Sequence, residues 1–331
     1  MKLKERGEFQ IIEHLKKQGR TIPELICGIG DDCSVARIDD NQELLTTTDL
    51  LTEGVHFDLD WSDLHHLGRK AVSVNVSDLA AMGAQPLFLF LSLAIPDNIN
   101  VDQLDQFLSG FLQASDAYGA VLAGGDTCRS RGGLTVSVSA QGVAIKATSI
   151  MRNGAENGDD LFATGTLGDS ALALRHLTAG KTPAPFLLGR HIDPTARIET
   201  GRALAEGGIP TAMIDISDGL LADLEHVLNA SGVGAVVDLA AIPLSREFQQ
   251  EMNNDSELMD LALGGGEDYE LLFTAPPGAQ KAISAIAGKT GVPISRIGHI
   301  DKNSAEFRLR GPSGAVELPQ QRGYKHFPDT P

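Results

Sequence analysis

The sequence contains little cysteine and few aromatic residues. Its 331 residues include three cysteines and one tryptophan, and Phe, Trp and Tyr together make up 5% of the chain. Cys27, Cys33 and Cys128 form no C-x-x-C pair, which disfavours a disulfide scaffold and a structural zinc site. We interpret the three as buried small hydrophobic residues in a reducing compartment, and we expect a cytoplasmic protein.

Positive charge and long apolar segments are also scarce. Lys and Arg total 27 against 44 Asp and Glu, which gives a net charge of −17. Such a chain does not hold nucleic acid or an anionic membrane through its own charge, and a phosphate ligand would need help from cations. The longest apolar run, Leu87 to Ile95, is far shorter than the roughly 20 residues that a membrane-spanning helix needs, and the charged start from Met1 to Arg6 is not typical of a signal peptide. We therefore expect neither a nucleic-acid partner nor a membrane partner.

Several nucleotide-binding and catalytic motifs are missing. The GKT sequences at Gly180 and Gly288 have Arg175 and Ile283 where a phosphate-binding P-loop requires its first glycine. The dinucleotide motif fails as well, because Cys33 stands at its third glycine position. The sequence also has no G-x-S-x-G and no H-E-x-x-H. A bound nucleotide would therefore need another kind of site.

Glycine is abundant, with 36 of the 331 residues, and the hydrophobic content of 42% is that of an ordinary globular protein. The length predicts two domains, and the polar segment 146–160 separates two stretches in which the apolar pattern starts afresh. We expect an α+β protein with a mixed sheet and helices in each domain, divided into residues 1–147 and 148–331. Helices are predicted over 9–15, 62–82, 102–118, 169–177, 197–206 and from 220 onward, and strands over 44–48, 87–95, 120–123, 134–141, 161–164, 212–216, 236–239 and 269–274.

One pattern recurs along the chain: a hydrophobic run ends in Gly, Ser or Thr beside an acidic residue. It occurs as IGDD (29–32), TTTD (46–49), AGGD (123–126), DISDG (215–219) and GGGED (264–268). One such pair alone is typical of a surface turn, but five in one chain, most of them after predicted strands, favour a shared site. Carboxylates and hydroxyls offer the hard oxygen ligands that Mg²⁺ prefers, and glycine lets backbone N–H groups approach phosphate oxygens.

Three further residues allow two interpretations each. Asp78 lies in a predicted apolar helix, where an unpaired carboxylate is costly, so either a metal ion or one of the nearby cations Arg69 and Lys70 can compensate it. His56 is either an ordinary hydrogen-bonded histidine or a site residue. Arg152 is either a linker charge or a clamp for phosphate.

Taken in order, these segments resemble the thiamine-monophosphate kinase family, which belongs to the aminoimidazole ribonucleotide synthetase-like superfamily. The matching sequences are GEFQII (7–12), GIGDDC (28–33), TTTDLLTEGVHF (46–57), KAVSVNVSDLAAMGAQP (70–86), AGGDT (123–127), DISDGL (215–220), GGGEDYELLF (264–273) and RGYKHF (322–327). The ordered set covers nearly the whole chain, and NVSDLAAMGA together with GGEDYEL is its most specific part. The resemblance implies the two-domain fold of that superfamily.

The resemblance also implies an activity and its site residues. The family transfers the γ-phosphoryl group of ATP to thiamine phosphate with several Mg²⁺ ions, which gives thiamine diphosphate in the last step of its biosynthesis. The implied metal ligands are Asp32, Thr47, Thr48, Asp49, Asp78, Asp126, Asp215 and Asp218. The implied ATP contacts are Gly125, Asp126, Arg152 and Ser217, and the implied contacts to thiamine phosphate are His56, Glu267 and Tyr324. A homodimer joined through the N-terminal domains is implied as well.

A phosphate acceptor needs little help from the protein in losing its proton. Its second pKa lies near 6, so it is mostly ionised at pH 7, and we expect neither a general base nor a covalent nucleophile. Two alternatives to this function stay open. One is another ATP-dependent enzyme of the superfamily, such as a purine-pathway cyclisation enzyme, and the other is a non-enzymatic acidic metal-binding protein.

Overall fold

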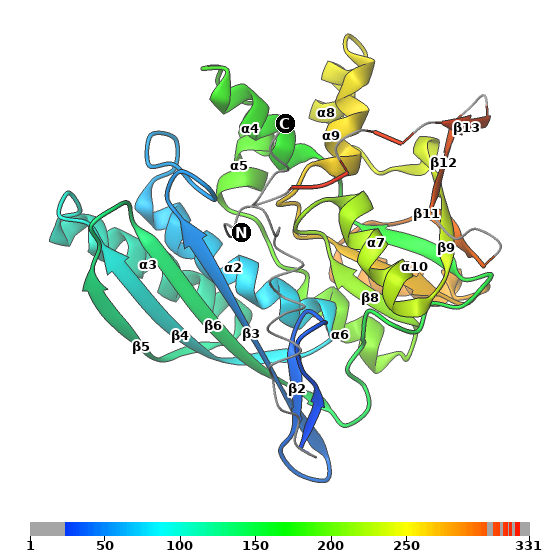
Figure 1. Ribbon diagram of the computed structural model, residues 1–331, viewed down its shortest axis with the longest axis horizontal. Helices are drawn as coiled ribbons and strands as arrows, with labels where there is room; N and C mark the ends of the chain where they lie inside the picture. The colour runs from blue at the N-terminus through cyan, green and yellow to red at the C-terminus, as the bar shows by residue number, and fades with distance from the viewer. Residues whose placement is uncertain (1–23, 303–306, 312–313, 317, 320–321, 325–331) are drawn as a thin grey trace, which may run out of the picture.

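The computed structural model describes residues 24–302, 307–311, 314–316, 318–319 and 322–324, and it contains two mixed β-sheets with helices packed on them (Figure 1). The helix predicted over 9–15 lies outside these residues. The α+β architecture predicted for each half of the chain is confirmed. The division between residues 147 and 148 falls in the segment between the last strand of the first sheet and the first strand of the second, and it stays a prediction.

The first sheet has six strands in the order β1-β2-β3-β6-β4-β5. Its strands are β1 (Leu25–Cys27), β2 (Ser34–Arg37), β3 (Gln42–Thr52), β4 (Gln85–Ile95), β5 (Val121–Arg129) and β6 (Thr135–Ile145). Neighbours pair antiparallel except β4 and β5, which run parallel. Helices α2 (Leu64–Ala81) and α3 (Val101–Tyr118) pack together and cover one face of this sheet.

Helix α2 forms because its residues are small or apolar almost all round and because a side chain caps its start. The carboxylate of Asp63 accepts a hydrogen bond from the backbone N–H of His66 at 2.8 Å. Close packing on α3 requires Gly110, since a Cβ there would lie 1.9 Å from the carbonyl oxygen of His65. The sequence predicts a helix over 62–82 with most of its second half buried, and in the structure most of α2 is buried along its whole length.

The second sheet has seven strands in the order β13-β12-β9-β11-β7-β10-β8. Its strands are β7 (Asp160–Thr164), β8 (Ala212–Asp215), β9 (Gly234–Asp238), β10 (Leu271–Ala275), β11 (Ile294–Asp301), β12 (Arg308–Gly311) and β13 (Gly314–Val316). The helices of this half are α4 (Asp169–Thr178), α5 (Pro185–Ile192), α6 (Ile198–Glu206), α7 (Leu220–Ser231), α8 (Arg246–Met252), α9 (Met259–Gly264) and α10 (Gln280–Thr290), with short 3₁₀ helices η2 (Leu239–Ala241) and η3 (Ser256–Leu258).

Of the two hydrophobic clusters among the described residues, one spans both halves and the other lies within the second half. The cluster that contains Leu79 of α2 also contains Met213 of β8 and Phe273 of β10. Helix α2 therefore packs against its own sheet on one side and against the second sheet on the other. This arrangement places side chains of α2 between the two halves of the molecule, where the site described below lies.

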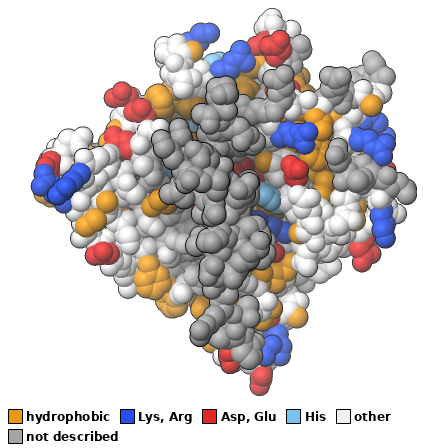
Figure 2. Space-filling view, in the orientation of Figure 1, with side chains coloured by type: hydrophobic (Ala, Val, Ile, Leu, Met, Phe, Trp, Pro, Cys, Tyr) orange, Lys and Arg blue, Asp and Glu red, His pale blue; other side chains and the backbone are white. Residues whose placement is uncertain are grey.

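The face of the first sheet that α2 and α3 do not cover carries exposed apolar side chains. Leu50 of β3 and Phe88 and Phe90 of β4 are exposed, Leu50 to 55%. Figure 2 shows hydrophobic side chains on the surface over these strands, at the lower left. Apolar groups gathered on one face of a sheet are typical of a surface that another protein surface covers.

Strand β5 differs from the prediction. The sequence predicted a strand over 120–123 that ends before the glycines, but the strand continues to Arg129 in parallel pairing with β4. A Cβ on Gly125 would lie 1.8 Å from the carbonyl oxygen of Leu91, so this glycine allows the two strands to approach. Cys128 is exposed on β5, so its interpretation as a buried residue was wrong.

In the part of the chain that the structure describes, no helix is long and apolar enough to cross a membrane.

Candidate active site

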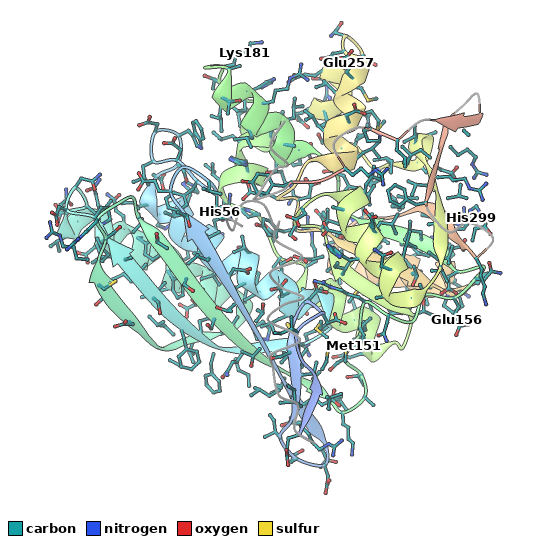
Figure 3. All side chains as sticks on the ribbon, in the orientation of Figure 1. His56, Met151, Glu156, Lys181, Glu257 and His299 are labelled. Carbon is teal, nitrogen blue, oxygen red and sulfur yellow. The ribbon has the colours of Figure 1, made fainter. Side chains whose placement is uncertain are left out.

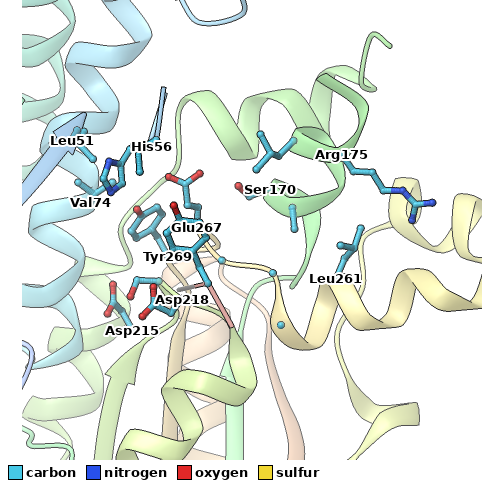
Figure 4. Close-up of a pocket in the computed structure, with 18 of the residues that line it drawn as sticks. Leu51, His56, Val74, Ser170, Arg175, Asp215, Asp218, Leu261, Glu267 and Tyr269 are labelled. Atoms are coloured by element: carbon cyan, nitrogen blue, oxygen red, sulfur yellow. The ribbon is translucent and has the colours of Figure 1, made fainter. Parts of the chain in front are cut away.

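A cavity of about 930 Å³ lies where the two halves meet (Figures 3 and 4). Its walls come from β3, the loop after it, α2, α4, α9, the β8–α7 connection and the segment 264–269. The predicted site residues that line it are Asp49, His56, Asp78, Asp215, Ser217, Asp218, Glu267 and Tyr324. Residues from six separate segments of the sequence therefore meet in one place.

Carboxylates gather at one side of this cavity. Oxygen atoms of Asp32, Asp78 and Asp215 all lie within 4.8 Å of one another. The hydroxyl of Thr47 donates to Asp78, and the hydroxyl of Ser77 donates to Asp215 at 2.6 Å. These bonds hold the carboxylates in place although the like charges repel.

Asp49 is fixed beside this cluster by its backbone. Its N–H donates to the side-chain oxygen of Asn75 on α2 at 3.1 Å. Burial, followed by the charge of Asp32, raises the pKa of Asp49 to about 6. The pKa of Asp215 rises to about 8 for the same two reasons, and burial together with Asp49 and Asp215 raises the pKa of Asp78 well above its usual value. Among the described residues, no Lys or Arg supplies Asp78 or Asp215 with the positive charge of an ion pair that would keep it ionised.

The cations next to Asp78 in sequence do not supply that charge. Lys70 pairs with Glu267 at 2.8 Å and Arg69 pairs with Asp193 at 2.9 Å, so the interpretation that one of them compensates Asp78 was wrong. Within the described residues, no Lys or Arg forms an ion pair with Asp78 or Asp215. The donor set of carboxylates and hydroxyls matches the hard oxygen ligands of Mg²⁺, so these residues fit a divalent cation.

Arg152 lies at the edge of the cluster. Its guanidinium donates to Asp32 at 2.6 Å, and its backbone N–H donates to Asp31 at 3.0 Å. The second carboxylate oxygen of Asp32 is buried and has no hydrogen-bond partner, which leaves it available to a further cation. Arg152 is therefore part of the site and not a solvated linker charge. Asp31 was missed as a site residue, although it adjoins Asp32 in the sequence.

The DISDG segment presents side chains to the cavity, and its amides are already used. One oxygen of Asp223, on α7, accepts hydrogen bonds from the backbone N–H groups of Ser217, Asp218 and Gly219 at 3.1, 3.1 and 3.0 Å. The prediction that glycine-flanked amides bind phosphate is therefore wrong for this segment. A carboxylate of the chain occupies the helix N-terminus that would otherwise attract an anion.

Two of the predicted substrate contacts, His56 and Glu267, lie next to one another in Figure 4, beyond Asp215 and Asp218. Tyr269, which the sequence did not predict as a site residue, lies beside them. The backbone N–H of Tyr324 donates to the carbonyl oxygen of Asp218 at 3.0 Å, which holds this C-terminal residue at the cavity.

Three predicted site residues lie away from the cavity when a single chain is considered: Thr48, Gly125 and Asp126. Asp49 lies opposite Val138, Val138 opposite Leu91, and Leu91 opposite Gly125. At about 4.8 Å per strand, Gly125 is roughly 14 Å from Asp49 across the sheet.

The same strands also separate these residues by face. Thr47 points toward α2, so Thr48 points to the opposite, open face, where its hydroxyl donates to the carbonyl oxygen of Val138 at 3.1 Å. Asp126 pairs with Ser92, whose side chain is exposed on the same open face. The roles predicted for Thr48, Gly125 and Asp126 therefore need something beyond a single chain, and they stay predictions.

Comparison with known proteins agrees with this geometry. Residues 30–144 match the family model described as AIR synthase related protein, N-terminal domain, and residues 156–309 match the corresponding C-terminal domain. The chain is 37% identical to the thiamine-monophosphate kinase of Haemophilus influenzae over 98% of this chain and 99% of that protein. It is 37% identical to the thiamine-monophosphate kinase of Escherichia coli K12 over 97% of this chain and 98% of that protein.

Solved structures show the same relationship. A structure described as AaThiL complexed with AMPPCP and TMP superposes with a TM-score of 0.82 at 33% identity, over 98% of this chain and 99% of that chain. The thiamine-monophosphate kinase of Stenotrophomonas maltophilia gives 0.76 at 35% identity, over 92% and 96% of the two chains. Hydrogenase maturation protein HypE, at 19% identity, shares the fold. The chain belongs to the thiamine-monophosphate kinase family, within the AIR synthase related proteins.

Proposed function

We propose that the protein transfers the γ-phosphoryl group of ATP to thiamine phosphate and so forms thiamine diphosphate, the last step of thiamine diphosphate biosynthesis. One observation carries the proposal: in a buried carboxylate cluster, neither Asp78 nor Asp215 has a Lys or Arg ion-pair partner among the described residues, and both line the same cavity as His56, Glu267 and Tyr324. The names of the relatives, and the relative described with AMPPCP and TMP, support the same reaction. Because the reaction consumes ATP, we also propose that the protein works in the cytoplasm.

Several Mg²⁺ ions are part of this proposal. Asp32, Asp49, Asp78, Asp215 and Asp218 would hold them, with Thr47 beside Asp78. Bound Mg²⁺ would neutralise the two polyanionic substrates and align them. Bound Mg²⁺ would bring Asp78 and Asp215 the positive charge that no Lys or Arg ion pair among the described residues supplies.

The chain's own residues would then position the reactants. Arg152 and Ser217 would contact ATP from the carboxylate side, and Glu267 and His56 would receive thiamine phosphate from the other side. Since the acceptor phosphate is already ionised, no side chain needs to remove a proton, and transfer proceeds directly and in line. A phosphorylated protein that accumulates with ATP alone and passes its phosphoryl group to thiamine phosphate would contradict direct transfer.

A homodimer would account for the residues that one chain leaves apart. Asp126 and Thr48 lie on the open apolar face of the first sheet, and a second copy covering that face would enclose them. We propose that Gly125 and Asp126 contact ATP and metal, and that Thr48 contributes as a metal ligand, in that assembly. Phe90→Asp, on this face, should shift the sedimenting species to the monomer, whereas Leu112→Asp, exposed on α3, should not. An unchanged Phe90→Asp dimer would refute this interface.

The function is tested by measuring thiamine diphosphate formation with and without Mg²⁺. Asp49→Asn and Asp126→Asn should each lower kcat/KM by about 100-fold. Asp102→Asn, in the first turn of α3, is the matched control and should stay near wild type. Wild-type protein that binds Mg²⁺ but forms no thiamine diphosphate would favour a metal-binding protein or another enzyme of the superfamily. Full activity in both variants would show that Asp49 and Asp126 are not required as metal ligands.

A further inference from the structure

Lys70 is a charged side chain inside the molecule. It lies on α2 with 2% of its surface exposed and ranks among the largest fully buried side chains of the described residues. Its ammonium group is 2.8 Å from a carboxylate oxygen of Glu267 and donates to the carbonyl oxygen of His56 at 3.1 Å. Lys70 therefore contacts two residues that the proposed function assigns to the substrate: His56 in its own half of the protein and Glu267 in the other half.

Among the described residues, Lys70 is the one Lys or Arg that forms an ion pair with Glu267. His191, on α5, has its Nδ1 atom 3.3 Å from the other carboxylate oxygen of Glu267 and 3.0 Å from the hydroxyl of Ser170. Burial, and then the nearby ammonium of Lys70, lower the pKa of His191 to about 4, so its ring is neutral at pH 7. His56 and Tyr269 also face Glu267, and Nδ1 of His56 accepts a hydrogen bond from the backbone N–H of Thr52 at 3.1 Å.

Burial and Lys70 act on Glu267 in opposite directions. Burial raises the pKa of Glu267, while Lys70, His191 and His56 lower it, and the net pKa is below the usual value. The backbone of Glu267 is held as well: its φ is 66°, in the left-handed region, and its N–H donates to the carbonyl oxygen of Ser217 at 2.7 Å. A non-glycine residue keeps such a conformation when its surroundings hold it there.

We infer that Lys70 is a positioning residue for substrate binding: it keeps the carboxylate of Glu267 ionised and directed into the cavity, where that carboxylate receives the cationic, amino-bearing part of thiamine phosphate. The inference rests on the proposed function for the identity of the substrate. Lys70 acts through Glu267, because Glu267 lines the cavity and Lys70 does not. None of the compared proteins' descriptions assigns a role to this lysine.

A purely structural role would have a different signature. If Lys70 only joined the two halves of the protein, its loss would lower stability and change the binding of both substrates together. If it sets the charge of Glu267, its loss leaves the carboxylate buried without a cation, and the pKa of Glu267 then rises toward neutrality. Substrate binding at that end of the cavity would become dependent on pH.

The experiment compares KM for thiamine phosphate in the full-length wild type and in Lys70→Met between pH 6 and 8.5, with saturating ATP and Mg²⁺. Ionisation of the substrate phosphate affects both proteins equally, so it cancels in the ratio of their KM values. We expect the ratio to be about tenfold or more at pH 6 and to fall as the pH rises and Glu267 ionises. KM for ATP should stay within about twofold at every pH.

Arg69→Met is the matched control. Arg69 is the preceding residue of α2 and also forms an ion pair between the two halves, with Asp193 at 2.9 Å, but it does not line the cavity. Its KM for thiamine phosphate should equal that of the wild type at each pH. A ratio for Lys70→Met that is near one, or that is raised equally at all pH values, would overturn the inference.

A second comparison covers the case in which Lys70→Met alone does not fold. Glu267→Gln is compared with the Lys70→Met, Glu267→Gln double variant, which leaves no unpaired charge buried. If Lys70 acts through Glu267, the two have the same KM for thiamine phosphate, and a further increase in the double variant would refute that. Wild type that forms no thiamine diphosphate would refute the proposed function instead, so the two failures are distinct.

Discussion

The carboxylate of Asp223 holds the segment that carries Ser217 and Asp218, and its removal should have a measurable effect on stability and on binding. Asp223 is 3% exposed, and one of its oxygens accepts three backbone hydrogen bonds at 3.0 to 3.1 Å. In Asp223→Ala these three amides lose their acceptor at the start of α7. A buried amide that is left without an acceptor costs about 1–3 kcal/mol, and the three share one oxygen, so we expect a loss of about 3–5 kcal/mol.

Asp223→Asn separates the hydrogen bonds from the charge. Asparagine keeps a carbonyl oxygen that can accept hydrogen bonds from the same amides. It also removes an ionisable carboxyl group, whose pKa is raised well above its usual value by burial and by the charges of Asp218 and Asp215. We therefore expect this variant to lose no more than about 1 kcal/mol relative to the wild type.

Urea unfolding at pH 7.5 measures the stability of both variants, and initial rates measure KM for ATP, for Mg²⁺ and for thiamine phosphate. Because Asp223→Ala frees the segment beside the metal cluster, KM for ATP and for Mg²⁺ should rise about tenfold, while KM for thiamine phosphate changes less. Glu225→Ala, exposed on the same helix, is the control. If Asp223→Ala unfolds at the same urea concentration as Glu225→Ala, the reasoning about the three amides is refuted.

Three other perturbations have expected outcomes. Asp78→Asn removes a negative charge from the cluster, so in EDTA it should stabilise the protein by about 1–2 kcal/mol while Mg²⁺-dependent activity falls about 100-fold; a lower urea midpoint would contradict this. Gly110→Ala puts a Cβ 1.9 Å from the carbonyl oxygen of His65 and should destabilise the protein by about 3 kcal/mol, measured by thermal unfolding. Burial raises the pKa of Asp268 to about 8, so the folded protein binds a proton that the unfolded chain has lost above pH 4, and stability falls with rising pH between these values, by up to about 1.4 kcal/mol per unit. Asp49, Asp78 and Asp215 add to the same slope, so Asp268→Asn should make it shallower between pH 5.5 and 8 in urea titrations without abolishing it, and an unchanged slope would contradict the raised pKa of Asp268.

Helices and strands could be predicted from the sequence where apolar residues continue in one pattern along the whole element. The helix predicted over 62–82 is α2, and the strand predicted over 87–95 is β4. The prediction failed for β5, because a glycine pair in a sequence is compatible with a turn and with close strand pairing. For Gly125, the structure decides between a turn and close strand pairing, because a Cβ there would clash with the carbonyl oxygen of Leu91 on the neighbouring strand.

The site was predictable to the extent that its residues belong to recognisable motifs. Asp32, Asp78 and Asp215 meet as predicted, whereas the face on which Asp126 lies depends on strand register, which no local pattern contains. Lys70 was noticed as a cation in an apolar helix, but its partner Glu267 is remote in sequence and comes near only through tertiary packing. Asp223 and His191 lie in ordinary amphipathic helices, and nothing in their sequence surroundings marks them.

If the substrates bind as proposed, helix α2 sets the distance between the two ends of their site. Lys70 forms an ion pair with Glu267, and Asp78 of the carboxylate cluster lies eight positions further along the same helix. At 1.5 Å per residue, the two anchor points are separated by about 12 Å along the axis, a length set by backbone hydrogen bonds and not by loops. Inserting one residue between Lys70 and Asp78 would increase their separation along the axis by about 1.5 Å and rotate one of them by about 100° relative to the other. The distance between the two ends of the site therefore cannot change in small steps. In the proposed function, the number of residues between Lys70 and Asp78 therefore fixes the length of ligand that fits between the two ends of the cavity.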